Sequence, residues 1–287
     1  MMEAKDDKTD VSKQTDSKIF STSLLAGALA GLVVDVTLFP LDTVKTRLQS
    51  QFGFWKSGGF KGIYKGLGPV VVGSAPSAGA FFASYNLIKD TMYPIIPQVL
   101  APASHVVCAS ISEVVACTIK VPMEVVKQRR QAIRGAGHPI KILTKAIKQE
   151  GLKGLYRGFG STIIRDVPFS AIQFPIWEAL KTEWRNSKGS EISSGEVAVC
   201  GALAGGIAGA ATTPLDVAKT RIMLADSHSK SESLRITGVI RELYKTSGFR
   251  GLFAGFTPRT LLIFLGGGIF FGVYEKSARL IDSLKLE

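Results

Sequence analysis

Pro40-Leu41-Asp42-Thr43-Val44-Lys45-Thr46-Arg47 is one of three related stretches in this chain. The other two are Pro122-Met123-Glu124-Val125-Val126-Lys127-Gln128-Arg129 and Pro214-Leu215-Asp216-Val217-Ala218-Lys219-Thr220-Arg221. Each copy places a carboxylate two residues after the proline, a lysine three residues after the carboxylate, and an arginine two residues after the lysine. The prolines stand at positions 40, 122 and 214, so the copies begin 82 and 92 residues apart. That period is too long for a solenoid repeat and suits a pair of membrane helices joined by a loop.

A second motif follows each copy in the same order. Its three versions are Gly62-Ile63-Tyr64-Lys65-Gly66, Gly154-Leu155-Tyr156-Arg157-Gly158 and Gly251-Leu252-Phe253-Ala254-Gly255. Each proline motif also ends an apolar run rich in small residues, as the end of a membrane span would. Two motifs repeated three times in one order predict three homologous repeats that form a single pseudo-symmetric unit.

Composition separates this chain from basic soluble proteins. The 287 residues carry a net charge of +12, yet 46% of them are hydrophobic. Nucleic-acid binding is not expected, because neither zinc-finger spacing nor a recognition-helix pattern is present. The three cysteines (Cys108, Cys117, Cys200) lie in apolar runs without a CxxC or Cys/His spacing. They predict buried free thiols, with no metal site, disulfide framework or cofactor.

Lysine and arginine gather on the loops after the proline motifs. Segments 45–66, 120–157 and 219–250 hold 5, 10 and 7 of them, whereas the connecting segment 90–103 holds none. Membrane proteins keep their positive loops on one side of the bilayer. An even number of spans then places both termini on the other side.

The pattern along the chain predicts a tail followed by six spans. Residues 1–18 mix lysine with acidic residues and predict a disordered tail that carries neither a transit peptide nor a signal peptide. Spans are expected near 20–49, 69–93, 103–131, 162–185, 194–222 and 256–284. Ionisable residues within them are typical of helices that line a watery cavity. Amphipathic stretches at 140–149 and 234–244 predict short helices on the membrane surface.

Small residues predict where helices approach closely. Gly27 and Gly31 form a small-xxx-small face in the first span, and Gly201 and Gly205 repeat it in the fifth. Glu113 interrupts the same pattern in the third span.

The repeated motifs resemble the mitochondrial carrier family from about residue 20 to the end. The resemblance implies an all-α membrane protein with three pseudo-symmetric repeats, and six transmembrane helices in a barrel with short surface helices in the matrix-side loops. It divides the carrier domain, residues 19–287, into repeats at 19–100, 101–192 and 193–287. It also implies a monomeric transporter of the mitochondrial inner membrane, not an enzyme, with both termini toward the intermembrane space.

In this family the acids and lysines of the proline motif form the matrix gate. The six matching positions are Asp42, Lys45, Glu124, Lys127, Asp216 and Lys219. The proline bends each helix toward the barrel axis, so three salt bridges between neighbouring helices are possible. The family braces them with a glutamine four residues after the lysine; Gln49 and Gln131 match, while Met223 does not. We therefore expect two braces and a somewhat weaker closed gate.

The opposite, cytoplasmic gate resembles the family's aromatic-acid-x-x-base motif in degraded form. Its charges are Lys89, Glu178, Lys181 and Glu275, which allow at most two bridges. This gate should be the weaker one. The alternative reading of any one such motif is an ordinary surface ion pair, which contributes only about 0–1 kcal/mol.

The family selects substrate at one level of its even-numbered helices. Seven residues after the second glycine of each Gly-x-x-x-Gly motif stand Gly73, Arg165 and Leu262, and Asp166 follows Arg165. An arginine beside an acid at this level resembles carriers of amino-acid-like substrates. Arg165 would take a carboxylate bidentately and Asp166 an ammonium.

Four further ionisable residues lie within the expected spans and belong to neither gate: Asp35, Glu113, Lys120 and Arg259. Asp35 lies two helical turns before Asp42 and should face the cavity, where charges are costly and usually functional. We expect Asp35 to contact substrate, against a structural pairing with Arg165 or Arg259. The other three are candidates for the same path.

Several stretches narrow the resemblance to the mitochondrial S-adenosylmethionine carriers. They are Gly59–Tyr64, Ser112–Cys117, Arg165–Ser170 and Gln173–Pro175. The resemblance implies exchange of S-adenosylmethionine for S-adenosylhomocysteine, with Asp35 meeting the sulfonium and no residue assigned to the adenine. The alternatives are a carrier of another amino acid or a non-transporting membrane scaffold. A catalytic membrane protein is disfavoured because no nucleophile–base constellation is present.

Overall fold

The computed structural model describes residues 27, 29–92, 101–225 and 235–284, and within them the chain is helical without strands. The predicted tail, residues 1–18, lies outside the described part. The first helix is described over residues 29–49. The others are α2 (Leu67–Met92), α3 (Ala101–Ala132), α4 (Pro139–Leu155), α5 (Phe159–Lys188), α6 (Ser194–Ala211), α7 (Thr213–Leu224), α8 (Ile236–Leu252) and α9 (Phe256–Leu284).

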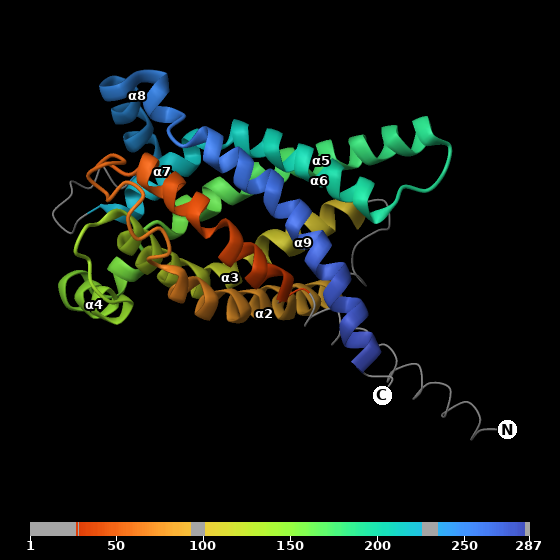
Figure 1. Cartoon of the computed structure of the whole chain (residues 1–287), viewed down its shortest axis with the longest axis horizontal. Coiled ribbons are helices and arrows are strands. Elements are labelled where there is room, and N and C mark those ends of the chain that lie inside the picture. The colour runs from red at the N-terminus through yellow and green to blue at the C-terminus, as the bar shows by residue number, and fades with distance from the viewer. Residues whose placement is uncertain (1–26, 28, 93–100, 226–234, 285–287) are drawn as a thin grey trace.

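The long helices form a closed ring. Helix α2 packs against α3, α5 against α6, and α6 against α9. The first helix closes the ring: Asp35 meets Ser74 on α2, and Val34 and Leu38 lie against Gly266 on α9. Helices α4, α7 and α8 gather at one end of the bundle (Figure 1). The expected all-α barrel of three helix pairs is confirmed.

The three odd-numbered spans respond differently to their prolines. The first helix runs through Pro40, and α3 runs through Pro122. The expected span at 194–222 is instead divided at Thr212 into α6 and α7. The Thr212 and Thr213 hydroxyls donate to the carbonyls of Ala208 and Gly209, and such back-bonding bends a helix just before the proline.

The two expected surface helices are present and longer than their apolar pattern. Helices α4 and α8 each continue through a glycine kink, at Gly151 (φ 66°) and Gly248 (φ 58°). Their apolar faces bury Ile142 and Leu243. The corresponding segment of the first repeat, residues 51–66, consists of turns instead of a helix.

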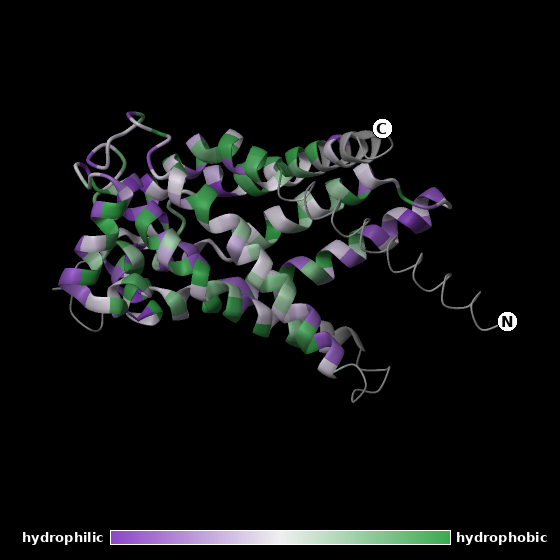
Figure 2. Cartoon of the chain, turned by 90° about the horizontal axis from the view of Figure 1, so that it is seen from below, coloured by the Kyte–Doolittle hydropathy of each residue, from purple (hydrophilic) through white to green (hydrophobic). Residues whose placement is uncertain are grey.

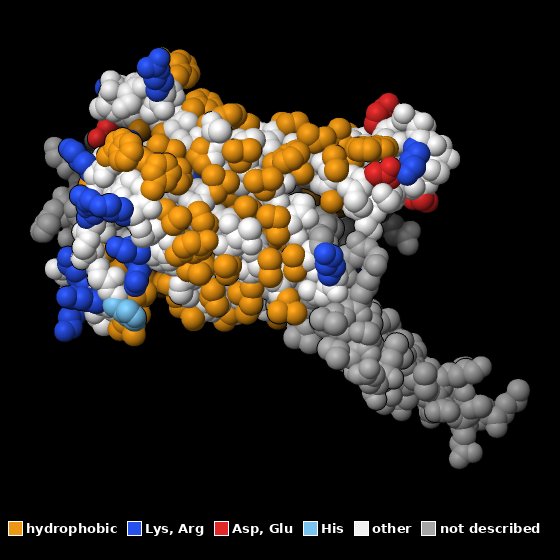
Figure 3. All heavy atoms as spheres, in the orientation of Figure 1, with side chains coloured by type: hydrophobic (Ala, Val, Ile, Leu, Met, Phe, Trp, Pro, Cys, Tyr) orange, Lys and Arg blue, Asp and Glu red, His pale blue; other side chains and the backbone are white. Residues whose placement is uncertain are grey.

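Hydrophobic side chains cover the middle of the bundle on the face shown in Figure 3, and lysine and arginine gather at the end with α4 and α8. Hydrophobic residues also run along the bundle helices in Figure 2. By length and composition, α2 and α6 qualify as membrane-crossing helices among the described residues. Helix α8 and the first part of α9, bent by 54°, pass the same test as a pair. The remaining helices carry charges along their length, as cavity-lining spans do.

Close approach through small residues occurs in only one of the two predicted places. A Cβ added at Gly205 would lie 2.8 Å from Ile263 on α9, so only glycine fits there. At Gly27 and Gly31 an added Cβ meets nothing within 4 Å in the described part of the molecule. The small face of the first helix instead borders open space, since Gly31 lines a cavity.

Candidate functional site

The acids and lysines of the three proline motifs form a charged ring near one end of the barrel. Each acid pairs with the lysine of the next repeat, not with the lysine of its own helix. The pairs are Asp42–Lys127 (2.8 Å), Glu124–Lys219 (2.7 Å) and Asp216–Lys45 (2.7 Å). The ring therefore ties the first helix, α3 and α7 together, and it includes all six predicted positions.

Amide side chains brace this charged ring. Gln49 donates to Asp216 (2.8 Å), and Gln131 donates to Asp42 (3.0 Å). Met223 occupies the third brace position, fully buried and unable to donate. Gln128, which the sequence reasoning missed, donates instead to Glu124 at 3.2 Å from one turn along the same helix. Because Gln128 and Glu124 lie on the same helix, this bond does not join two repeats, and Gln49 and Gln131 are the two braces among the described residues.

The arginine that ends each proline motif adds a second cyclic set of bonds. Each arginine Nε donates to the carbonyl oxygen at the brace position of another repeat. The bonds are Arg47 to Gln131 (2.9 Å), Arg129 to Met223 (3.3 Å) and Arg221 to Gln49 (3.3 Å). Because the acceptors are backbone atoms, this set survives the change from glutamine to methionine at position 223.

The three acids of the charged ring do not share cations equally. Asp216 Oδ2 pairs with Lys45, while its Oδ1 meets Arg259 at 2.5 Å and Arg165 Nε at 3.9 Å. Arg259 also donates to Thr212 (2.8 Å) and is buried. Asp42 and Glu124 each form one ion pair among the described residues. Asp216 therefore joins the ring to the arginine predicted to bind substrate.

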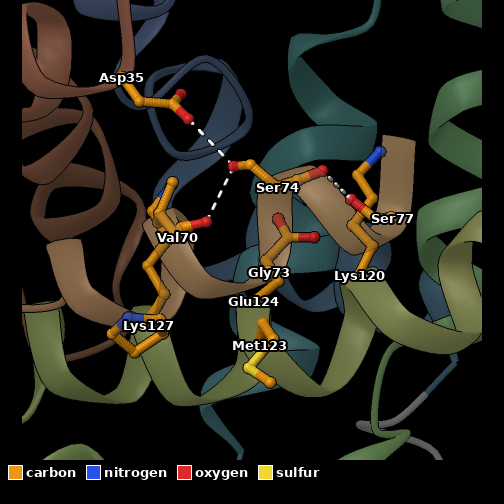
Figure 4. Close-up of a pocket in the computed structure, with 10 residues that line it drawn as sticks. Asp35, Val70, Gly73, Ser74, Ser77, Lys120, Met123, Glu124 and Lys127 are labelled. Atoms are coloured by element: carbon orange, nitrogen blue, oxygen red, sulfur yellow. Dashed lines mark hydrogen bonds between the residues drawn. The ribbon is translucent and has the colours of Figure 1, made fainter. Parts of the chain in front are cut away.

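Above the ring lies a cavity of about 210 Å³. Figure 4 shows Asp35 pointing from the first helix to Ser74 on α2, with Lys120 and Glu124 reaching from α3. The Asp35–Ser74 bond is 3.1 Å. Gly73 forms part of the wall, and a Cβ added there would lie 2.9 Å from Met123 Cγ. Asp35 thus faces the cavity and pairs with neither Arg165 nor Arg259 in the described interactions.

Arg165 and Asp166 meet each other beside this cavity. Arg165 Nη2 lies 2.7 Å from Asp166 Oδ1. Lys120, which lines the cavity, lies 3.6 Å from Asp166 and 2.8 Å from Glu113. Glu113 and Lys120 thus pair as their spacing allowed. These two carboxylates and two cations form one connected set of ion pairs. The set offers charges of both signs, as the binding of a zwitterion requires.

The same set contains a potential metal-ligand cluster. Ligand atoms of Glu113, Cys117 and Asp166 lie within 4.8 Å of one another. The Lys120 ammonium already lies between the two carboxylates. A cation in that position leaves this cluster poorly suited to a metal ion, because like charges repel.

A second cavity, of about 410 Å³, is also lined by Asp35. Gln173, Ile263 and Phe270 line it together with three glycines of α6 and α9. Leu262, the predicted contact residue, is half-buried, and its neighbour Ile263 lines this cavity. Asp35 is therefore the residue that the two cavities share.

Among the described interactions, the four predicted charges at the far end of the barrel show one ion pair. Glu178 pairs with Lys181 at 2.7 Å within α5, and the same lysine lies 3.8 Å from the Trp177 ring centre. Lys89 lies on α2, and Glu275 belongs to the part of α9 whose side chains are outside the described set. The described pair is thus local to one helix.

Comparison with known proteins agrees with this architecture. The family model for mitochondrial carrier proteins matches residues 16–95, 98–188 and 190–284. A Drosophila melanogaster protein named as an S-adenosylmethionine mitochondrial carrier protein homolog is 51% identical over 266 residues, covering 92% of this chain and 94% of that protein.

Two vertebrate relatives carry the name mitochondrial S-adenosylmethionine carrier protein. The one from Danio rerio is 51% identical over 264 residues, covering 92% of this chain and 98% of its own. The one from Mus musculus is 47% identical over 266 residues, covering 93% and 97%. The chain belongs to the mitochondrial carrier family, whose members are transporters and not enzymes.

Proposed function

We propose that this protein exchanges cytosolic S-adenosylmethionine for matrix S-adenosylhomocysteine across the mitochondrial inner membrane. The observation that carries the proposal is the Arg165–Asp166 pair (2.7 Å) beside a cavity that also presents Asp35. Relatives about half identical to this chain are named for S-adenosylmethionine. The chain would act as a monomer, because its charged ring closes within a single chain. Both termini would face the intermembrane space, because the lysine- and arginine-rich loops lie on the opposite side of an even number of spans.

Recognition would begin at the amino-acid end of the substrate. Without substrate, Arg165 and Asp166 neutralise each other. A zwitterion inserted between them offers its carboxylate to the guanidinium and its ammonium to the carboxylate, so each charge keeps a partner. The Lys120 ammonium would stay paired with the carboxylates of Asp166 and Glu113 both before and after the substrate binds.

The positive sulfonium would lie near Asp35. This carboxylate accepts one bond from Ser74 and forms no ion pair among the described residues, so its charge is available to a cation. The adenosine would extend into the second cavity, where Ile263 and Phe270 offer apolar surface and Gln173 an amide. S-Adenosylhomocysteine lacks the sulfonium charge and would therefore contact Asp35 more weakly.

Transport would proceed by alternating access between the charged ring and the far gate. Here the ring is closed, and Glu178 pairs with Lys181 within α5. A substrate carboxylate at Arg165 would draw this guanidinium away from Asp216 and leave that ring acid with one cation fewer. Substrate binding would in this way favour ring opening, because a ligand shifts an equilibrium only through contacts that differ between the two states.

The test is exchange in liposomes loaded with S-adenosylhomocysteine, with labelled S-adenosylmethionine outside. Uptake should require the adenosyl counter-substrate and should be absent from empty vesicles. If another amino acid is exchanged and neither adenosyl compound is, the assigned substrate is wrong, while the alternating-access mechanism stands. Intact, inserted protein that exchanges nothing would indicate a scaffold.

Asp35→Asn tests the sulfonium assignment. The variant should weaken binding of S-adenosylmethionine by about tenfold, since the coulombic attraction between a carboxylate and a sulfonium in a wet cavity is on the order of 1–2 kcal/mol. S-Adenosylhomocysteine, which has no charge at sulfur, should change by less than about threefold. Competition assays with both ligands give the comparison, and equal losses would remove Asp35 from this role.

A further inference from the structure

The second cavity, of about 410 Å³, has a largely apolar wall with two polar side chains among its described lining residues. These two are Asp35 and Gln173, and the other lining residues are glycine, alanine, valine, isoleucine and phenylalanine. Asp35 also lines the first cavity, so Gln173 is the polar group that belongs to the second cavity alone. In a cavity of this kind, a few polar groups in an apolar wall decide which ligand fits and how it is oriented.

The Gln173 amide reaches the cavity from α5 and lies against α6. A Cβ added at Gly205 of α6 would lie 3.4 Å from Gln173 Nε2, so the amide rests where α6 has no side chain. Within the described part of the chain this amide forms no hydrogen bond. Its Nε2 can therefore donate to a ligand while its Oε1 accepts from the same ligand.

The order of the polar groups along the site matches the covalent order of the proposed substrate, and this step rests on the proposed function. Arg165 and Gln173 both belong to α5 and stand eight residues apart, which is about 12 Å along a helix axis. Asp35 borders both cavities. In S-adenosylmethionine the sulfonium lies between the amino-acid group and the adenosine. A carboxylate at Arg165 and a sulfonium at Asp35 thus direct the adenosine toward Gln173.

The chemistry of adenine fits the groups found at this end. Adenine presents its 6-amino donor next to a ring-nitrogen acceptor, and a carboxamide complements that pair with one acceptor and one donor. The flat faces of the base are apolar and stack well against aromatic rings. Phe270 and Ile263 supply such surface from α9, which also presents Gly266 and Gly267 without side chains.

We propose that Gln173 is the residue that selects adenine, with its Oε1 accepting from the 6-amino group and its Nε2 donating to the neighbouring ring nitrogen. S-Adenosylmethionine and S-adenosylhomocysteine carry the same base, so Gln173 serves both ligands equally. Asp35, by contrast, distinguishes them by charge. The two residues therefore divide recognition of the base from recognition of the sulfonium.

The test is competition for S-adenosylmethionine uptake by two compounds: S-adenosylhomocysteine and its analogue with unsubstituted purine in place of adenine. The parent should bind the adenine compound about fivefold more tightly, because the analogue leaves Gln173 Oε1 without a donor. Gln173→Leu should weaken S-adenosylhomocysteine about fivefold and leave the analogue nearly unchanged, so the preference for adenine disappears. Gln149→Leu, which changes an exposed amide on α4 outside the cavity, is the matched control and should keep the preference of the parent.

The ratio of the two affinities separates recognition of the base from a general loss of structure. Equal losses of both compounds in Gln173→Leu, or a parent that exchanges S-adenosylmethionine without preferring adenine, would overturn the role of Gln173 and leave the proposed function standing. A parent that exchanges neither adenosyl compound would instead remove the proposed function, and the adenine assignment with it. Circular dichroism of each variant checks that the helices are intact.

Discussion

The two ends of the barrel use similar charges in opposite ways. At the charged ring, every acid pairs with a lysine from another repeat, and the pairs are largely buried: Lys219 is 2% exposed and Asp216 4%. At the far end, Glu178 is 65% exposed and pairs with Lys181 on its own helix. A pair within one helix does not hold two helices together, whereas a pair between repeats does. The ring end is therefore closed by ion pairs, and the described far-end pair contributes nothing to closure.

Charge reversal in the ring should have the largest effect. Lys127→Glu places two acids together at Asp42, whose only described cation is Lys127. We expect exchange to fall by about a hundredfold or more, since breaking a buried pair costs about 3–5 kcal/mol. The double variant Asp42→Lys/Lys127→Glu restores opposite charges and should recover much of the rate. Equal rates for single and double variants would contradict a functional pair.

Arg165→Ala should abolish exchange while leaving a folded, inserted protein. The variant removes the proposed carboxylate contact and also the 3.9 Å link from the substrate level to Asp216. Binding of substrate should be lost below detection, because one bidentate charge pair carries most of the orientation. Arg165→Lys should recover little, since lysine lacks the planar fork. Near-normal exchange in Arg165→Ala would place the site elsewhere.

Met223→Gln should make the ring end of the barrel more stable relative to the far end, because it adds a third glutamine brace to the charged ring. Position 223 is buried and equivalent to Gln49 and Gln131, so the new amide should reach Glu124. A net gain of about 1 kcal/mol in the closed state should raise the unfolding temperature and slow exchange about fivefold. Leu at the same position keeps the volume without the amide and serves as the control. Faster exchange in Met223→Gln would contradict a brace.

Lys181→Gln at the far end should have the smallest effect. Its partner Glu178 is mostly in solvent, and exposed pairs of this kind contribute about 0–1 kcal/mol. Exchange should change by about twofold or less, and the unfolding temperature should stay nearly constant. A loss comparable to that of Lys127→Glu would show that Lys181 forms bridges between helices in another state of the carrier.

The sequence by itself determined the architecture of this protein. Two motifs in three copies established the repeats, and apolar runs ending at prolines located the helices within a few residues. The repeated motif named the six ring charges, and the resemblance to the carrier family assigned them to a gate and placed the Arg165–Asp166 pair at the substrate level; the spacing itself could be read because it is a local property of a helix. The surface helices at α4 and α8 were visible for the same reason.

Only the tertiary structure decided which acid of the charged ring pairs with which base. Whether Lys45 meets Asp42 or Asp216 depends on neighbouring helices, and the answer is Asp216. The sharing of Asp216 by Lys45 and Arg259 arises from packing between helices, whereas Gln128 reaches Glu124 within its own helix. The break at Thr212 follows the hydroxyl bonds of Thr212 and Thr213 to carbonyls four residues earlier, which the proline motif alone did not predict. The pairings between repeats depend on contacts between residues distant in sequence, for which one chain read alone carries no local pattern.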